Sequence, residues 1–351
     1  MKPMKSFATL LFIALFALGA CGDRSSTPLA SLPAAALAMT NVTTFAGTAL
    51  SFGSTDGTGS TARFYYPAGI TTDGTNIYVA DTSNHIVRKI VISTGVVTFI
   101  AGTAGTYGTT DGTGAGASFN TPYGVITDGT NLYVADTSNH TIRKVVISTG
   151  VVTTFAGTAG TSGSANGTGI AATFNSPRGI TTDGTNLYVA DTGNNSVRQI
   201  VISTAAVTTL AAGFNSPSGI TTYGTNLYVA DTNNHTIRQI VISTGTVTTI
   251  AGTTGTAGSA DGTGIAATFN TPQGITTDGT NLYVADTGNH TVRKVVISSG
   301  VVTTPVGSAG SAGSADGVGS GARFYNPIGI TTTGITLYVA DYSNHTIRKI
   351  Q

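Results

Sequence analysis

The tetrapeptide Tyr-Val-Ala-Asp occurs six times in this chain of 351 residues, and its regular recurrence constrains the fold more than any other feature. Successive copies are 55 residues apart, except for one interval of 40 residues. A fixed period of this length indicates a repeat architecture, in which each unit buries its apolar faces against its neighbours. The six copies begin at Tyr78, Tyr133, Tyr188, Tyr228, Tyr283 and Tyr338.

Each repeat contains four short stretches of strand-like composition. In the second repeat they are residues 123–127, 131–136, 141–147 and 151–156. The segments between them contain Gly, Asn and Asp, which supply the positive φ angles that tight hairpins need. The second stretch is apolar at consecutive positions, which suits a sheet covered on both faces. We therefore predict an all-β fold, a six-bladed β-propeller of four-stranded antiparallel blades.

The two ends of the repeat region predict how the ring closes. Residues 42–46 match a fourth strand but precede the first complete repeat, whereas residues 347–350 match a third strand with no fourth strand after it. Six sets of first to third strands and six fourth strands are present, and they form complete blades only if the N-terminal strand completes the last one. Such a closure would remove the exposed sheet edges and lock the ring.

The N-terminal segment resembles the leader of a bacterial lipoprotein. Lys2 and Lys5 precede an apolar run over residues 7–18 and the sequence Leu-Gly-Ala-Cys, which ends at Cys21, the single cysteine of the chain. This pattern is typical of a secretory signal, and the resemblance implies lipid attachment at Cys21. We expect residues 1–20 to be the signal peptide, residues 21–40 a flexible tether and residues 41–351 the propeller. The expected location is the bacterial cell envelope, lipid-anchored at the outer membrane.

The repeats also resemble the NHL repeat. The resemblance covers all six copies, with three departures: Asn195 replaces a histidine, and Tyr223 and Thr333 replace the Asp of the first hairpin turn. It implies a six-bladed propeller, a fold class that also includes metal-dependent lyases and lactonases. In the second copy it rests on Pro122-Tyr123-Gly124-Val125, Asn131-Leu132-Tyr133-Val134-Ala135-Asp136, Asn139-His140 and Ile142-Arg143-Lys144.

Charge and composition narrow the partners and cofactors. The net charge is +1 and charged residues make up 9% of the chain, so no basic field exists for nucleic acid. We expect a monomer without a nucleic-acid partner, and we predict no cofactor. Calcium stays an alternative, although no Gly-rich segment carries more than one carboxylate, which is fewer than a Ca²⁺ site normally uses. These carboxylates belong to Asp56, Asp111, Asp261 and Asp316.

Long Gly-rich connections between blades are expected on one face of the ring, together with the Asp-Thr-x-Asn-His turn. Binding residues often lie on such loops, although the inserts could equally be flexible spacers. Aromatic and basic residues particular to one blade belong to this face: Arg63, Tyr65, Tyr66, Tyr107, Arg323 and Tyr325. The long connections are residues 47–63, 102–118, 157–173, 252–268 and 307–322.

One position changes its chemistry from blade to blade while its neighbours stay constant. It lies between Pro and Gly at the start of each innermost strand, near the predicted channel mouth. These residues form our candidate ligand-contacting ring, and drift at a solvent-exposed position is the alternative explanation. They are Ala68, Tyr123, Arg178, Ser218, Gln273 and Ile328.

Three other equivalent sets are expected to be structural. The histidines occupy one repeat position, so their copies cannot converge on one centre, and we expect them to satisfy local turn hydrogen bonds. The Asp that ends each second strand is expected to bond to the following turn or to the Arg of the next strand. A phenylalanine of each repeat is expected to anchor the core. The histidines are His85, His140, His235, His290 and His345, and the phenylalanines are Phe64, Phe119, Phe174, Phe214, Phe269 and Phe324.

The sequence favours a surface-tethered, non-enzymatic binding or scaffolding module, which acts through the long-loop face on a protein, peptide or glycan. No catalytic residue and no metal ligand is predicted. A metal-dependent lyase or lactonase-like enzyme is one alternative, supported by analogy of fold alone. A structural surface protein without a specific ligand is the other, because near-identical repeats fit it equally well.

Overall fold

The structure is a computed structural model that describes residues 40–351. The predicted signal peptide, the lipidation at Cys21 and the tether lie outside the described residues, apart from Thr40 at the end of the tether. Within residues 40–351, no helix is long and apolar enough to span a membrane.

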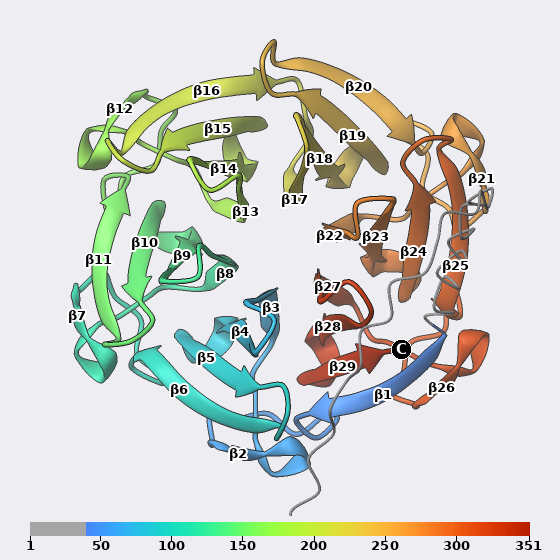
Figure 1. The fold of residues 1–351 in the computed structure, drawn as a ribbon, viewed down its shortest axis with the longest axis horizontal. Coiled ribbons are helices and arrows are strands. Elements are labelled where there is room, and N and C mark those ends of the chain that lie inside the picture. Colours follow the sequence, from blue (N-terminus) through green and yellow to red (C-terminus); the bar gives the residue numbers. More distant parts are fainter. Residues whose placement is uncertain (1–39) are drawn as a thin grey trace, which may run out of the picture. The chain divides into compact units, whose positions relative to one another are not determined.

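Six antiparallel sheets surround a central axis, as the sequence predicts (Figure 1). In blades 1 to 5 the chain runs outward from the innermost strand to the fourth strand, and in blade 6 it runs outward over the first three strands. Blades 1 to 3 contain β3 (Pro67–Thr72), β4 (Asn76–Asp81), β5 (Ile86–Val91) and β6 (Val96–Gly102); β8 (Pro122–Thr127), β9 (Asn131–Asp136), β10 (Thr141–Val146) and β11 (Val151–Ala156); and β13 (Pro177–Thr182), β14 (Asn186–Asp191), β15 (Ser196–Val201) and β16 (Ala206–Ala212). Blades 4 to 6 contain β17 (Pro217–Tyr223), β18 (Asn226–Asp231), β19 (Thr236–Val241) and β20 (Thr246–Ala251); β22 (Pro272–Thr277), β23 (Asn281–Asp286), β24 (Thr291–Val296) and β25 (Val301–Gly307); and β27 (Pro327–Thr332), β28 (Leu337–Asp341), β29 (Thr346–Ile350) and the N-terminal β1 (Asn41–Ala46).

The N-terminal strand closes the ring. Strand β1 pairs antiparallel with β29, with Val42 opposite Ile350 and Thr44 opposite Arg348. In Figure 1 the blue β1 lies beside the red β29 as the outermost long strand of blade 6. The predicted closure is therefore confirmed, and it joins the two ends of the described chain in one sheet.

Five blades contain a short fifth strand in addition to the four predicted strands. The Gly-rich connection before each of these blades runs to the outer rim, where two residues pair with the fourth strand and a single 3₁₀ turn follows. Blade 4 has four strands, because the connection before it is the short one. The fifth strands and their 3₁₀ turns are β2 (Gly57–Thr58) with η1 (Gly59–Thr61), β7 (Gly112–Thr113) with η3 (Gly114–Gly116), β12 (Gly167–Thr168) with η5 (Gly169–Ala171), β21 (Gly262–Thr263) with η8 (Gly264–Ala266), and β26 (Gly317–Val318) with η10 (Gly319–Gly321).

A second set of 3₁₀ turns joins the second strand of each blade to the third. Each turn ends at a residue in the left-handed conformation, which is a histidine in five blades and Asn195 in blade 3. These turns are η2 (Thr82–Asn84), η4 (Thr137–Asn139), η6 (Thr192–Asn194), η7 (Thr232–Asn234), η9 (Thr287–Asn289) and η11 (Tyr342–Asn344).

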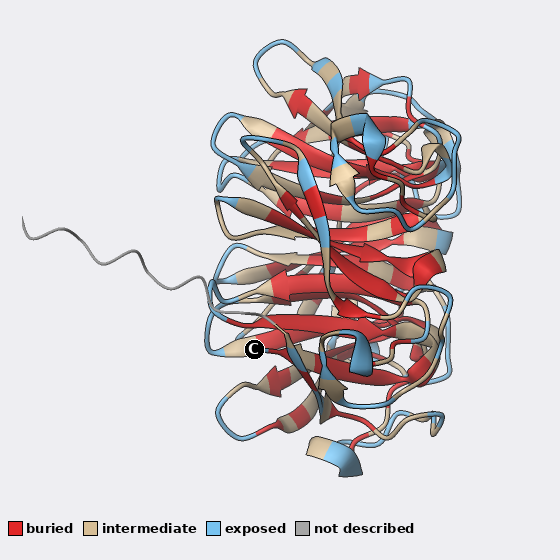
Figure 2. Ribbon diagram, turned by 90° about the vertical axis from the view of Figure 1, so that its right-hand side faces the viewer, coloured by how far each residue is buried: buried red, intermediate tan, exposed pale blue. Residues whose placement is uncertain are grey.

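The hydrophobic core lies between neighbouring blades. Tyr133 and Ala135 of blade 2 pack in one cluster with Leu187 and Val189 of blade 3. Figure 2 shows the buried segments in the middle of the strands and the exposed turns at the two ends of the blades. Because both faces of each sheet are covered in this way, the second strands are apolar at consecutive positions. The predicted phenylalanine anchors are buried in all six blades.

Glycine residues let the innermost strands approach one another around the axis. A Cβ atom on Gly179 would lie 2.0 Å from the carbonyl oxygen of Ser218 in the next blade. The same contact closes the ring between blades 6 and 1, where a Cβ on Gly329 would lie 2.1 Å from the carbonyl oxygen of Ala68. Only glycine has no Cβ, so this position allows a narrow central channel.

Candidate binding site at the channel mouth

The variable residues lie where the innermost strands begin, around a small central cavity of about 70 Å³. Below them the cavity is lined by glycines and by one β-branched residue per blade, such as Ile70 and Val125. Five of the six variable residues line this cavity, and Arg178 does not. The five are Ala68, Tyr123, Ser218, Gln273 and Ile328. Their contact with a ligand stays a prediction.

Two of the variable residues meet across the channel. The hydroxyl group of Tyr123 on blade 2 donates a hydrogen bond to Oε1 of Gln273 on blade 5. Burial raises the pKa of Tyr123 to about 12, so the phenol keeps its proton at physiological pH and donates it to the amide oxygen. The Tyr123 side chain therefore bridges two opposite blades at the channel mouth.

Arg178 covers this bridge and is the only blade arginine without a carboxylate partner among the described residues. Its guanidinium carbon lies 5.0 Å from the centre of the Tyr123 ring, within the range of a cation–π contact. The arginines of the third strands each form an ion pair with the Asp of the same blade, whereas Arg178 forms none in residues 40–351. Arg178 also acts electrostatically on Tyr342 of blade 6. Burial raises the pKa of Tyr342, and the positive charge of Arg178 lowers it in part. The guanidinium is thus a cation with unused donors.

Four aromatic side chains on the same face as Arg178 form a continuous row, which we call the aromatic platform: Phe52, Tyr65, Tyr66 and Tyr342. Ring centres are 4.6 Å apart between Phe52 and Tyr65, 5.1 Å between Tyr65 and Tyr66, and 4.7 Å between Tyr66 and Tyr342. Phe52 is 63% exposed. The platform joins the long connection before blade 1 to the η11 turn of blade 6 and contacts His345, whose ring centre is 4.5 Å from that of Tyr66.

The sequence indicated part of this platform. It placed Tyr65 and Tyr66 on this face, but it missed Phe52 and Tyr342. A signal for Tyr342 existed, because it stands where the other five repeats have threonine. Tyr107 and Tyr325 do not join the platform, since each contacts a different histidine, His85 and His290. Arg63 and Arg323 bond to carbonyl oxygens of their own 3₁₀ segments.

The histidines are structural, as expected, but each Nδ1 atom bonds to the next blade and not to its own turn. Nδ1 of His85 on blade 1 accepts a hydrogen bond of 3.1 Å from the backbone N–H of Thr121, which precedes blade 2. His345 closes the circle by accepting the N–H of Tyr66 at 3.1 Å, and Asn195 does the same in blade 3 with its Oδ1. The left-handed backbone at this position aims the side chain away from its own turn and toward the next blade. A histidine that accepts at Nδ1 must be neutral there.

Each buried Asp fulfils both roles that the sequence predicts. Oδ2 of Asp136 accepts hydrogen bonds from Asn139 of the following turn at 2.7 Å and from Arg143 at 2.9 Å. Its Oδ1 accepts the backbone N–H of Asn120 at 2.7 Å. Burial raises the pKa of Asp136 to about 6, against the opposing effects of Arg143 and the other donors.

The carboxylates of the Gly-rich connections also bind arginine. Asp111 pairs with Arg143 at 2.7 Å, and Asp56, Asp261 and Asp316 form the same pair in their blades. Asn166 takes this place in blade 3. The connections are therefore fixed to their blades by hydrogen bonds, which disfavours their interpretation as flexible spacers. Within residues 40–351, no three His, Cys, Asp or Glu side chains are arranged to hold a metal ion.

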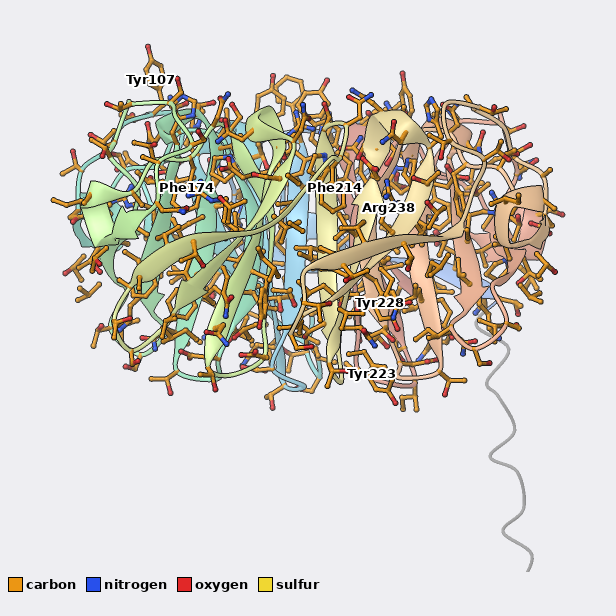
Figure 3. All side chains as sticks on the ribbon, turned by 90° about the horizontal axis from the view of Figure 1, so that it is seen from above. Tyr107, Phe174, Phe214, Tyr223, Tyr228 and Arg238 are labelled. Carbon is orange, nitrogen blue, oxygen red and sulfur yellow. The ribbon has the colours of Figure 1, made fainter. Side chains whose placement is uncertain are left out.

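The long connections share one face only in part. In Figure 3 the labelled Tyr107, from a long connection, lies on the face opposite to Tyr223, from a short hairpin turn. The second half of each connection leaves this face and follows the outer rim as the fifth strand. The face near the axis is thus formed by the first half of the connections, the 3₁₀ turns and the variable residues.

Comparisons with known proteins agree with this architecture. The model of the NHL repeat family matches residues 269–295. NHL repeat-containing protein 2 of Homo sapiens is 33% identical over 161 residues, which cover 42% of this chain and 22% of that protein. The Gallus gallus protein of the same name is 28% identical over 305 residues, covering 81% and 38%. The chain therefore spans less than two fifths of the length of the curated relatives it matches.

Solved structures share the fold at low sequence identity. A Bacteroides thetaiotaomicron protein of unknown function has a TM-score of 0.71 at 23% identity, covering 88% of this chain and 75% of that one. An auxiliary nutrient binding protein of the same organism has a TM-score of 0.70 at 18% identity, covering 88% and 76%. Virginiamycin B lyase of Staphylococcus aureus has a TM-score of 0.51 at 15% identity, covering 81% and 94%.

The six sheets and their closure around one axis define this protein as a six-bladed β-propeller. Residues 269–295, which belong to blade 5, match the model of the NHL repeat.

Proposed function

We propose that this protein is a non-enzymatic binding module that holds a glycan carrying carboxylate groups on the aromatic platform and Arg178. The observation that carries the proposal is an arginine without a carboxylate partner on the same face as a row of partly exposed aromatic rings, one of which, Tyr342, is close enough to feel its charge. Aromatic rings pack against the apolar faces of sugar rings, and their hydroxyl groups bond to sugar hydroxyls. Arginine binds carboxylate with paired hydrogen bonds.

The geometry supports ligand binding on this face of the ring. The platform extends from the exposed Phe52 at its outer end to Tyr342, which lies close enough to Arg178 to feel its charge. Because the neighbouring rings stack on one another, a sugar ring would pack against the exposed Phe52, and further sugars would meet the edges and hydroxyl groups of the tyrosines before a carboxylate reaches Arg178. The Tyr123–Gln273 bridge narrows the channel mouth, which favours a ligand that lies across this face over one that enters the channel.

A binding role is in keeping with two structural neighbours that are described as auxiliary nutrient binding proteins. The resemblance of the N-terminal segment to a lipoprotein leader would place the module on the outer membrane, where extracellular glycans are accessible. Tethering through Cys21 is part of this proposal.

The test is titration calorimetry with an acidic glycan, oligogalacturonate, and a neutral glycan, a cello-oligosaccharide. We expect oligogalacturonate to bind more tightly, and we expect Arg178→Gln to weaken it about tenfold, since a charged hydrogen bond contributes about 1.5–3 kcal/mol. Phe52→Ala should weaken both glycans. The matched controls are Arg63→Gln and Tyr107→Ala, which change an arginine and a tyrosine of the same face outside the platform.

Two results would contradict the proposal. One is the absence of binding by either glycan to the full-length protein. The other is an equal loss of oligogalacturonate binding in Arg178→Gln and Arg63→Gln, because only the first of these removes the arginine beside the platform.

A further inference from the structure

Blade 4 lacks the 15-residue insert whose counterparts complete the other five blades. Blade 5 shows what such an insert contacts. The carbonyl oxygen of Gly258 accepts a hydrogen bond of 2.7 Å from Asn289, and the carbonyl oxygen of Ala260 accepts one of 2.9 Å from Arg293. The carboxylate of Asp261 pairs with the same guanidinium at 2.9 Å.

The insert of blade 5 also covers the edge of the outer strand. Gly262 pairs with Val302, and Thr263 pairs with Val301. The N–H of Gly264 then donates a hydrogen bond of 2.9 Å to the carbonyl oxygen of Gly300. Seven consecutive residues, Gly258 to Gly264, therefore provide all of these contacts.

Blade 4 keeps the groups that would receive these contacts. Asn234, Arg238, Val247 and Gly245 stand at the positions of Asn289, Arg293, Val302 and Gly300. In the described chain the hydrogen bonds of Arg238 are limited to one with Asp231 at 3.1 Å, so its outer nitrogen has no partner there. The Asn234 amide likewise donates to Asp231 alone.

The exposed fractions of the side chains also differ between blades 4 and 5. The Arg238 side chain is 17% exposed, whereas that of Arg293 is 1% exposed. Val302 is 1% exposed, and Val247 is only partly buried. Strand β20 forms the outer edge of its sheet, without the two-residue strand that covers the other five. An open strand edge is a template for the addition of another strand. Figure 3 shows Arg238 in this blade, between the two faces of the ring.

We propose that the outer edge of blade 4 is a peptide-binding site, which takes an extended segment of a partner protein carrying an Asp followed by Gly. The segment would pair with β20, place its carboxylate on Arg238 and supply carbonyl oxygens to Arg238 and Asn234. Four of the five inserts of the chain itself define this chemistry, and the fifth carries Asn166 in place of the Asp. The site lies on the outer rim and is independent of the platform at the channel mouth.

The test uses the heptapeptide Gly-Ser-Ala-Asp-Gly-Thr-Gly, which is the sequence of residues 258–264, with blocked ends and a fluorescent label. Fluorescence anisotropy with the full-length protein should show saturable binding. Replacement of the peptide Asp by Ala should weaken binding roughly tenfold or more, because the charged hydrogen bonds to arginine are lost. An Asn version should bind with intermediate strength, since Asn166 occupies this position in blade 3.

Two protein variants separate the site from unspecific binding. Arg238→Lys keeps the charge beside Asp231 but removes the second donor nitrogen, so peptide binding should weaken, whereas Arg293→Lys should leave it unchanged. Insertion of a copy of residues 253–267 between Ala212 and Gly213 should fill the edge and abolish binding. The proposal is overturned if the heptapeptide does not bind, or if Arg238→Lys and Arg293→Lys bind it equally.

Discussion

The hydroxyl group of Tyr123 donates a hydrogen bond to Gln273 across the axis of the propeller, which joins the innermost strands of two opposite blades. These residues are 150 positions apart in the sequence. Their hydrogen bond connects two of the six variable positions across the channel, and the guanidinium of Arg178 packs on the Tyr123 ring.

The bridge should contribute measurably to stability. Tyr123→Phe removes the donor and leaves the Gln273 oxygen without its partner in a narrow channel, so we expect the free energy of unfolding to fall by about 1–2 kcal/mol. Urea denaturation followed by fluorescence measures this change. Tyr107→Phe is the control, because Tyr107 is 70% exposed. Equal stability of Tyr123→Phe and wild type would mean that the bridge contributes nothing.

The histidine that links blade 6 to blade 1 should be replaceable by asparagine but not by alanine. Asn195 performs the same role in blade 3, accepting the N–H of Ser216 at 2.8 Å. We therefore expect His345→Asn to change the free energy of unfolding little at pH 8. His345→Ala should lower it by about 1–3 kcal/mol, because the N–H of Tyr66 loses its acceptor. Thermal unfolding of the three proteins distinguishes these cases.

The difference in stability between wild type and His345→Asn should depend on pH. Burial lowers the pKa of His345 below its ordinary value of 6.5, so the His345 imidazole binds a proton less readily in the folded protein than in the unfolded chain. Wild type should therefore lose stability relative to His345→Asn as the pH falls below 6.5 toward the lower pKa of the folded state. Above pH 7 the difference should be constant. A difference that does not change between pH 8 and pH 5 would contradict a neutral histidine acceptor.

The two carboxylates that bind Arg143 should differ strongly in their importance. Asp136 is fully buried and accepts three hydrogen bonds, so Asp136→Asn should lower the free energy of unfolding by about 3–5 kcal/mol. The Asp111 side chain is 48% exposed, and blade 3 carries asparagine at this position. Asp111→Asn should therefore cost less than about 1 kcal/mol. Chemical denaturation of both variants tests the contrast, and equal losses would refute it.

Because the innermost strands approach one another closely, we expect even a change from glycine to alanine there to destabilise the protein. Gly179→Ala would place a methyl group 2.0 Å from the carbonyl oxygen of Ser218, so we expect a loss of about 3 kcal/mol. Gly116→Ala is the control, because no atom lies within 4 Å of its added Cβ. Its effect should stay within about 0.5 kcal/mol. Thermal unfolding gives the comparison, and a stable Gly179→Ala variant would show that the ring can expand.

The sequence by itself determined the fold to the level of blades, strands and ring closure. The period of the Tyr-Val-Ala-Asp motif, the turn residues and the unmatched strands at the two ends are local features, and they gave six blades closed by β1. The buried phenylalanines and the Asp136–Arg143 pair followed from the same repeats. Each of these features recurs in every repeat or lies at an end of the repeat region, so comparison of the six copies was sufficient to interpret it.

Tertiary structure decided what happens between blades. His345 accepts the N–H of Tyr66 although 279 residues separate them, and no local pattern reveals which blade a side chain in the left-handed conformation will reach. The aromatic platform depends on the same junction, because ring closure brings Tyr342 beside Tyr66. The fifth strands and the open edge of blade 4 depend on where each insert folds back. These contacts join residues of different blades, so they form only when the blades pack against one another. The sequence of a single repeat therefore does not reveal them.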